Sequence, residues 1–371
     1  MKGYVRLLAV SLASLALFSC GGSGNNQSSG GGRGMAMKDV ILVDEGSGID
    51  DKSFNAATWR GITAHFGDTP ENASQRGVRY EELYSSSQDK IWENLNIATD
   101  EGARLIIGTG FTFEEPIQRV AKANPDQHYL LIDGSNGDID NLRGVLFKEH
   151  EGAFLVGVAV ALQAQADGIA DPKFGFVGGM QSDVISRFEL GYIQGILSVL
   201  PDALIEDFYA DSWGAPEVGK TKAKDWFNKG FYAILSAAGG TGSGVIAEAK
   251  EQRMLGKNVW ALGVDSDQYE DGLYSEGESA VLTSMLKLVE KAVSDALIDV
   301  DSNQFTGGTV YYGLAEGGVG FSTRNSRLNE EVIAQVRALA DKIVRGEIVV
   351  YGTYAEAKAN NLLPNNPLIL S

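Results

Sequence analysis

The chain contains 371 residues and carries a formal net charge of −18 at pH 7, from 49 acidic and 31 basic side chains. Such an acidic surface argues against nucleic-acid polymers and anionic membranes as ligands, because both are negatively charged themselves. The length is about twice that of a usual single domain, so we expect two lobes. Hydrophobic residues make up 44% of the chain, which is ample for packed cores.

The N-terminal residues combine a short apolar run with a single cysteine. Two basic residues precede the run from Leu7 to Phe18, which is too short to span a bilayer and has the length of a signal-peptide core. Cys20 is the only cysteine, so it cannot form an internal disulfide. We predict a signal peptide over residues 1–19, a lipid anchor at Cys20 and a flexible linker over 20–37, rich in Gly, Ser and Asn. The alternative is a free thiol behind an ordinary secretory signal.

The first strand and helix of the main body follow the linker. Val40 to Val43 are four apolar, mostly β-branched residues and predict a buried strand. The acids and glycines of residues 44–48 end this strand, because they favour a turn. A helical pattern begins at Ser53. The loop between them therefore lies at the carboxyl end of a strand, which is where open α/β sheets bind ligands.

Further strands and helical patterns alternate along the rest of the chain. Strands are predicted over residues 78–83, 105–108, 129–132, 145–147, 174–177, 204–209, 232–235, 259–264 and 281–283. Helices are predicted over residues 90–101, 152–166, 184–200, 217–228, 285–300 and 332–345, with others after residues 111 and 244. This alternation is typical of βαβ units, so we predict an α/β protein with two doubly wound parallel-sheet lobes.

Motifs for covalent, metal or nucleotide-cofactor chemistry do not emerge from the sequence. The glycine run from Gly239 to Gly244 opens a helix, but it lacks the Walker A ending and the dinucleotide-binding spacing. Its backbone N–H groups could contact a polar ligand, or the glycines could simply permit a tight turn. The three histidines are dispersed, and the sole cysteine is assigned to the anchor. We therefore expect no catalytic residue, no metal and no cofactor.

Acidic residues recur where predicted strands end. Each acid alone could be a helix cap or a turn residue. Together at the carboxyl ends of parallel strands, with a lysine and two aromatic residues, they predict a ligand site. Carboxylates accept hydrogen bonds from sugar hydroxyls and base N–H groups, and aromatic faces stack on flat rings. These residues are Glu45, Asp133, Asp265, Lys287, Phe54 and Trp213.

Five segments of the sequence together resemble a known family. They are Ile49 to Asn55, Glu151 to Gly157, Ala238 to Gly244, Gly263 to Tyr269 and Leu282 to Lys287. The chain resembles, from about residue 39 to residue 350, the basic membrane protein family of lipid-anchored, substrate-binding proteins of nucleoside ABC transporters.

The resemblance implies a type I periplasmic binding protein fold, in which the chain passes three times between two lobes. The N-terminal lobe is then expected over residues 38–148 and about 265–305. The C-terminal lobe is expected over residues 149–264 and about 306–371.

The resemblance also implies a set of ligand contacts. Phe54 and Trp213 are expected to sandwich a purine, with Asp133 and the acid after the first strand at the edge of the base. The ribose hydroxyls are expected at Asp265 and Lys287. The complete predicted set is Glu45, Phe54, Asn55, Asp133, Phe188, Trp213, Gly239, Asp265 and Lys287.

Two positions depart from the pattern of the family. Relatives carry Asp nine residues before the Phe, whereas this chain has Glu45 there, which leaves the preferred base open. Trp213 stands where a purine nucleoside receptor of the family has Phe, which keeps or enlarges the stacking surface.

These observations predict an extracytoplasmic, monomeric binding protein, anchored to the bacterial membrane by lipid at Cys20. It is expected to bind nucleosides, purine nucleosides in particular, and to deliver them to an ABC permease and its ATPase. One alternative is a ligand-sensing or adhesive surface lipoprotein without a transporter. The other is a nucleoside-hydrolysing enzyme, which would need a general acid or base and usually a metal cluster.

Overall fold

The computed structural model describes residues 38–362. The predicted signal peptide, Cys20 and the linker up to residue 37 lie outside the described residues. Each helix within residues 38–362 is too short or too polar to cross a membrane.

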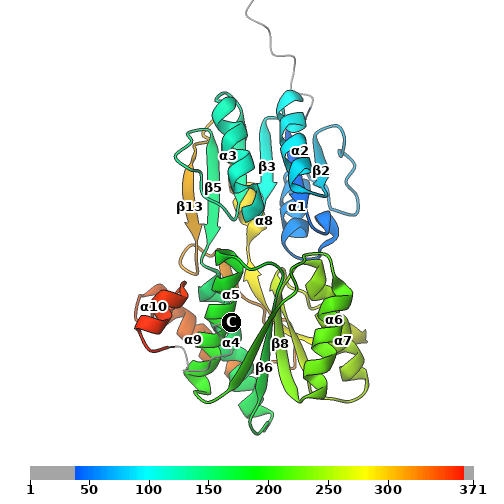
Figure 1. The fold of residues 1–371 in the computed structure, drawn as a ribbon, viewed down its shortest axis with the longest axis vertical. Helices are drawn as coiled ribbons and strands as arrows, with labels where there is room; N and C mark the ends of the chain where they lie inside the picture. The colour runs from blue at the N-terminus through cyan, green and yellow to red at the C-terminus, as the bar shows by residue number, and fades with distance from the viewer. Residues whose placement is uncertain (1–37, 363–371) are drawn as a thin grey trace, which may run out of the picture. The chain divides into compact units, whose positions relative to one another are not determined.

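The first sheet has six strands in the order β13-β5-β4-β3-β1-β2, and every pairing in it is parallel (Figure 1). Its strands are β1 (Val40–Glu45), β2 (Tyr80–Ser85), β3 (Leu105–Thr109), β4 (His128–Ile132), β5 (Leu142–Phe147) and β13 (Gly308–Tyr312). The helices beside it are α1 (Phe54–His65), α2 (Gln88–Asp100), α3 (Glu114–Ala123) and α8 (Val289–Asp301), with 3₁₀ turns at Gly48–Asp50 and Phe111–Phe113.

The apolar run of β1 is buried on both faces of this sheet. Val40 and Leu42 belong to the core that also contains residues of α1 and α8. Ile41 and Val43 belong to the core that contains residues of α2 and α3. Successive side chains of a strand point to opposite faces, so a strand covered by helices on both sides must be apolar throughout.

The second sheet has six strands in the order β14-β12-β9-β8-β6-β7, and only the pairing of β14 with β12 in it is antiparallel. Its strands are β6 (Lys173–Gly178), β7 (Leu204–Tyr209), β8 (Phe231–Ala237), β9 (Trp260–Asp265), β12 (Val281–Lys287) and β14 (Val319–Phe321). The helices that follow the same part of the chain are α4 (Glu149–Ala166), α5 (Asp183–Val199), α6 (Pro216–Asn228), α7 (Gly240–Met254), α9 (Glu330–Val344) and α10 (Tyr354–Ala359). A separate hairpin pairs β10 (Leu273–Ser275) with β11 (Glu278–Ser279).

Two parallel sheets with helices between successive strands confirm the predicted α/β class. The predicted helix over residues 285–300 is wrong at its start, because Met285 to Lys287 belong to β12 and α8 begins at Val289. The spacing of apolar residues favours a helix there, but β12 pairs with β9 on one side and β14 on the other, and this pairing decides the structure. The strands β13 and β14 were not predicted. Both are short, and β13 is a partly exposed edge strand without a continuous apolar run.

The chain passes between the sheets three times, at Lys148, at Leu288 and at residues 313–318. The expected lobe boundaries differ from this sheet membership at two strands. The expected N-terminal lobe included β12, which pairs with β9 of the second sheet. The expected C-terminal lobe included β13, which pairs with β5 of the first sheet. Strand pairing across the chain, which a local pattern does not reveal, decides both positions.

Helices α4 and α5 approach each other through glycines. A Cβ atom on Gly195 would lie 2.2 Å from the carbonyl oxygen of Phe154, and one on Gly157 would lie 2.4 Å from that of Tyr192. Since real Cβ atoms do not come so close to backbone, any larger residue would push the helices apart. This contact matters to the ligand site described below, because α5 forms one of its walls.

We predict that Gly195→Ala destabilises the protein by about 1–3 kcal/mol, because the added methyl group meets backbone that cannot move aside. The free energy of unfolding in urea measures the loss. Gly320→Ala is the matched control, since a Cβ on Gly320 would meet no atom within 4 Å. Equal stability of the two variants would contradict the close approach of α4 and α5.

Candidate functional site

A pocket lies where strand ends of both sheets meet. The first sheet contributes residues at the ends of β1, β3 and β4, and the second sheet contributes residues at the ends of β8, β9 and β12. The start of α1 and the first turns of α5 complete the wall. Ligand sites of α/β sheets form at such carboxyl ends, because the loops there diverge and leave a crevice.

All nine residues predicted to contact the ligand line this one pocket, although they come from segments far apart in the sequence. They are Glu45, Phe54, Asn55, Asp133, Phe188, Trp213, Gly239, Asp265 and Lys287. The structure thus brings the predicted set together, while the contact of each residue with a ligand stays a prediction.

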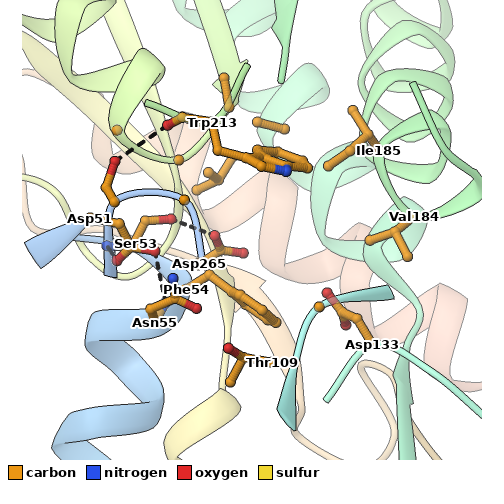
Figure 2. Close-up of a pocket in the computed structure, with 18 of the residues that line it drawn as sticks. Asp51, Ser53, Phe54, Asn55, Thr109, Asp133, Val184, Ile185, Trp213 and Asp265 are labelled. Atoms are coloured by element: carbon orange, nitrogen blue, oxygen red, sulfur yellow. Dashed lines mark hydrogen bonds between the residues drawn. The ribbon is translucent and has the colours of Figure 1, made fainter. Parts of the chain in front are cut away.

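Two aromatic rings line the pocket, one at the start of α1 after the first sheet's β1 and one in the loop after the second sheet's β7. Figure 2 shows the ring of Phe54, from the start of α1, on one side of the pocket and the indole of Trp213 on the other. The indole packs over Gly179, where a Cβ would lie only 2.3 Å from it. The ring of Phe111 contacts it edge-on, at 6.2 Å between centroids and an interplanar angle of 65°. These two contacts, one from each sheet's part of the chain, fix the orientation of Trp213 in this structure.

A buried ion pair joins the two sheets at the pocket. The Lys287 Nζ at the end of β12 donates a hydrogen bond of 2.6 Å to Asp133 Oδ2, beyond the end of β4. Lys287 is only 2% exposed. Burial lowers the pKa of Lys287, but the charges of Asp133, Glu149 and Asp265 outweigh it and raise that pKa overall. The lysine is therefore charged at neutral pH.

The two aspartates that follow β4 and β9 share an uncommon backbone conformation and similar electrostatics. Asp133 has φ +66° and Asp265 has φ +63°, in the left-handed region that non-glycine residues seldom adopt. Burial raises the pKa of each to about 6, and the charge of Lys287 opposes that rise in both. Asp265 also accepts a hydrogen bond of 2.5 Å from the hydroxyl of Ser53, which links it to the other sheet.

A loop before α1 organises the base of the pocket. The carboxylate of Asp51 accepts hydrogen bonds from the backbone N–H groups of Ser53, Asn55 and Ala56, at 2.8–3.0 Å. It caps the helix that presents Phe54 and satisfies N–H groups that a helix start leaves free. The side chain of Asn55 donates to the carbonyl oxygen of Glu45 at 2.9 Å, which ties α1 to the end of β1.

Several lining residues were not predicted from the sequence. Ser53 and Asp51 lie inside a segment that carried the family resemblance. Thr109 directly follows the strand predicted over residues 105–108, so the strand-end argument could have found it. Thr112 donates a hydrogen bond to the carboxylate of Glu45. Val184 at the start of α5 carries no polar signal, and only the packing of α5 places it in the wall.

Two buried polar atoms at the pocket have no hydrogen-bond partner among the described residues. They are Thr109 Oγ1 and Asp133 Oδ1. Both residues line the pocket, and Figure 2 shows them at its edge. Buried oxygens normally have a donor, so this pair is suited to a ligand that carries N–H or O–H groups.

The fold has two largely parallel sheets, and a pocket with aromatic faces and hydrogen-bonding groups lies at their strand ends. This combination is typical of a substrate-binding protein. The comparison with known families makes this specific. A sequence model of the family described as "ABC transporter substrate-binding protein PnrA-like" matches residues 37–354, and the chain belongs to this family. The predicted family is thereby confirmed, and it is a family of substrate-binding proteins and not of enzymes.

Curated relatives match almost the whole chain. It is 33% identical over 357 residues to the "ABC transporter nucleoside-binding protein BmpA" of Lactococcus lactis, covering 94% of this chain and 99% of the relative. It is 34% identical over 361 residues to the "CD4+ T-cell-stimulating antigen" of Listeria innocua, with the same coverage. It is 32% identical over 349 residues to "Basic membrane protein A" of Borreliella burgdorferi, covering 93% and 94%.

Solved structures support the fold. A solute-binding protein of an ABC transporter system from Aeropyrum pernix K1 superposes with a TM-score of 0.75 at 27% identity, covering 88% of this chain and 98% of that one. A sugar transporter structure from Clostridium phytofermentans superposes with a TM-score of 0.54 at 13% identity, covering 77% and 99%, and shows the fold alone. The predicted type I periplasmic binding protein fold is confirmed.

We predict that Asp265→Asn stabilises the unliganded protein at pH 7.5 by about 1–3 kcal/mol. The pKa of Asp265 in the folded state, about 6, lies above its ordinary value of 3.8, so ionisation of this acid costs folding free energy as the pH rises from 4 to 6. The gain should shrink at pH 4, where the folded protein already holds the proton. Urea unfolding at the two pH values measures it.

Asp68→Asn is the control of opposite sign. The hydroxyls of Tyr80 and Ser74 donate to the Asp68 carboxylate and lower its pKa, so its removal should not stabilise the protein at pH 7.5. An Asp265→Asn effect that is the same at both pH values would contradict the burial cost assigned to Asp265.

Proposed function

We propose that this protein binds nucleosides, purine nucleosides in particular, as the substrate-binding component of an ABC transporter. The observation that carries the proposal is the pairing of two aromatic rings across a pocket with buried carboxylates and a charged lysine beside them. In this proposal a flat base stacks between the rings, and a polyhydroxylated sugar forms hydrogen bonds with the charged and polar groups. The nucleoside-binding relative in Lactococcus lactis supports the same ligand class.

The chemistry of the pocket fits each half of such a ligand. Stacking on aromatic rings contributes about 1–3 kcal/mol per base and tolerates different bases. Asp265 can accept hydrogen bonds from ribose hydroxyls, and the free oxygen of Asp133 can accept one from a base N–H. The ammonium of Lys287 can donate to a ribose oxygen. The binding residues come from both sheets, so we propose that the lobes close over the ligand by bending at the three crossings.

Glu45 bears on which base is preferred. Burial raises its pKa, and the hydroxyl of Thr112 donates to its carboxylate. Titration calorimetry of the purified protein against adenosine, inosine, guanosine, cytidine and uridine tests both the ligand class and the base preference. Failure of every nucleoside to bind would overturn the proposed function.

We predict that Trp213→Ala and Phe54→Ala each weaken nucleoside binding about ten- to a hundredfold, because each removes one stacking face. Trp213→Phe keeps an aromatic face and should bind nearly as well as the unaltered protein. Tyr311→Ala is the control, since this exposed tyrosine lies on β13 outside the pocket. Normal binding by both folded alanine variants would place the base elsewhere.

We propose further that the protein is a monomer held at the outer face of a bacterial membrane by lipid on Cys20. Substrate-binding proteins of ABC transporters act outside the cytoplasm, and the signal-like run before a sole cysteine supports an anchor of this kind. Cys20 lies outside the described residues, so the support comes from the sequence.

Cys20→Ser is therefore expected to shift the protein from the membrane fraction to the soluble fraction, because the lipid on this cysteine supplies most of the anchoring. Membrane fractionation and metabolic labelling with a radioactive fatty acid measure the change. A variant that stays wholly with membranes and still takes up label would show that the anchor lies elsewhere.

A further inference from the structure

Glu149 is a fully buried acid beside the pocket but not part of its lining. It is the first residue of α4 and directly follows Lys148, where the chain first passes from one sheet to the other. A carboxylate in the first turn of a helix is favoured by the helix dipole. A buried charge otherwise costs several kcal/mol, so its partners indicate why it is there.

Both oxygens of Glu149 have a cationic partner, but of two kinds. Its Oε1 lies 3.0 Å from the Nζ of Lys287 in an ion pair that lacks hydrogen-bond geometry, and its Oε2 accepts a hydrogen bond of 2.6 Å from the Nε of Arg187. Arg187 lies on α5, next to Phe188 of the pocket wall. With Asp133, these residues form a row in which acids and bases alternate, in the order Asp133, Lys287, Glu149 and Arg187. The first three are buried, and Arg187 is partly exposed.

The row supplies the directional contacts of the Lys287 ammonium. The four-carbon stem of a lysine is flexible, and around the Nζ of Lys287 lie the rings of Phe54, Phe147 and Phe188, at 4.9–5.6 Å. Aromatic faces attract an ammonium but do not set its direction sharply. Asp133 holds it from one side, and Glu149 holds it from the segment that enters α4.

The two contacts of Lys287 differ in what a ligand does to them. Asp133 lines the pocket, and its Oδ1 has no partner among the described residues, so a ligand in the pocket can compete for this carboxylate. Glu149 does not line the pocket, and Arg187 holds its second oxygen. Burial raises the pKa of Glu149, but the charges of Lys287 and Arg187 outweigh burial and lower that pKa overall. The pKa of Asp133, by contrast, is raised to about 6.

We propose that Glu149 is a positioning residue, whose carboxylate, held by Arg187, keeps the ammonium of Lys287 directed at the pocket without touching the ligand. This proposal deepens the proposed function. Only its affinity test depends on the proposed function, because the test without ligand does not need a nucleoside to bind. Glu149 and Lys287 also adjoin two different crossings, at Lys148 and Leu288, so the contact joins the segments that connect the two sheets.

The first test needs no ligand. In the full chain labelled with ¹⁵N-lysine, the buried, ion-paired ammonium of Lys287 should give a resonance protected from exchange, assigned by its loss in Lys287→Met. Glu149→Gln should shift this resonance or broaden it by exchange. Glu151→Gln should leave it unchanged, because Glu151, two residues along the same helix, bonds to the backbone N–H of Leu314 instead. An unchanged resonance in Glu149→Gln would overturn the proposal, whether or not nucleosides bind.

The second test measures affinity by calorimetry. Glu149→Gln should weaken a purine nucleoside about tenfold or more, and the free base less than twofold, because Lys287 is assigned to the ribose. In the Lys287→Met background the same change should have little further effect, since residues that act through one another are not additive. Additive losses, or equal losses for nucleoside and base, would mean a merely structural role.

A variant of the other partner covers the case in which Glu149→Gln does not fold. Arg187→Gln removes the side chain that holds the carboxylate but leaves the carboxylate itself. It should shift the Lys287 resonance and weaken nucleoside binding in the same sense by a smaller factor. Arg187→Gln with an unaltered resonance would overturn the proposal as well. Failure of the unaltered protein to bind any nucleoside would instead overturn the proposed function, and the resonance would still decide the role of Glu149.

Discussion

The ion pair between Lys287 and Asp133 is the interaction on which the arrangement of the pocket depends. Lys287 ends a strand of one sheet, and Asp133 follows a strand of the other, so their 2.6 Å contact brings the two sheets' strand ends into one site. The pair is almost fully buried, so Asp133 would become a buried charge without its cation if Lys287 moved away, at a cost of several kcal/mol. Geometry and electrostatics are therefore linked at this point, because anything that separates the sheets also exposes or isolates a charge.

Two residues of the site lower the stability of the folded protein. Asp133 and Asp265 hold left-handed backbone conformations, and burial raises the pKa of both. Strained backbone and buried acids are unfavourable to the unliganded fold, and they persist where the structure around them is rigid. Here that rigidity comes from parallel strands buried on both faces and from the glycine-mediated contact between α4 and α5. The stable sheets thus carry residues that are poor for folding and well suited to recognition.

Much of this architecture could be predicted from local pattern. The apolar run of β1 and the alternation of strands and helices indicate an α/β protein, and the acids Glu45, Asp133 and Asp265 stand out because they follow predicted strands. The pairing of Phe54 with Trp213, and the addition of Asn55, Phe188 and Gly239, came from the family resemblance. Local pattern failed at β12, where a helical spacing of apolar residues overlaps a strand held by two neighbours. It also failed at β13, an exposed edge strand.

The sequence by itself determined the kinds of element and their order, because a strand covered on both faces must be apolar and a turn needs residues that tolerate it. It also determined which side chains stand at the strand ends. Only the tertiary structure decided that β12 joins the second sheet and β13 the first, and that Ser53 reaches Asp265. It alone placed Glu149 and Arg187 behind Lys287. These contacts join residues as much as 212 positions apart, and they depend on how the sheets are connected and packed, which no local pattern of residues encodes.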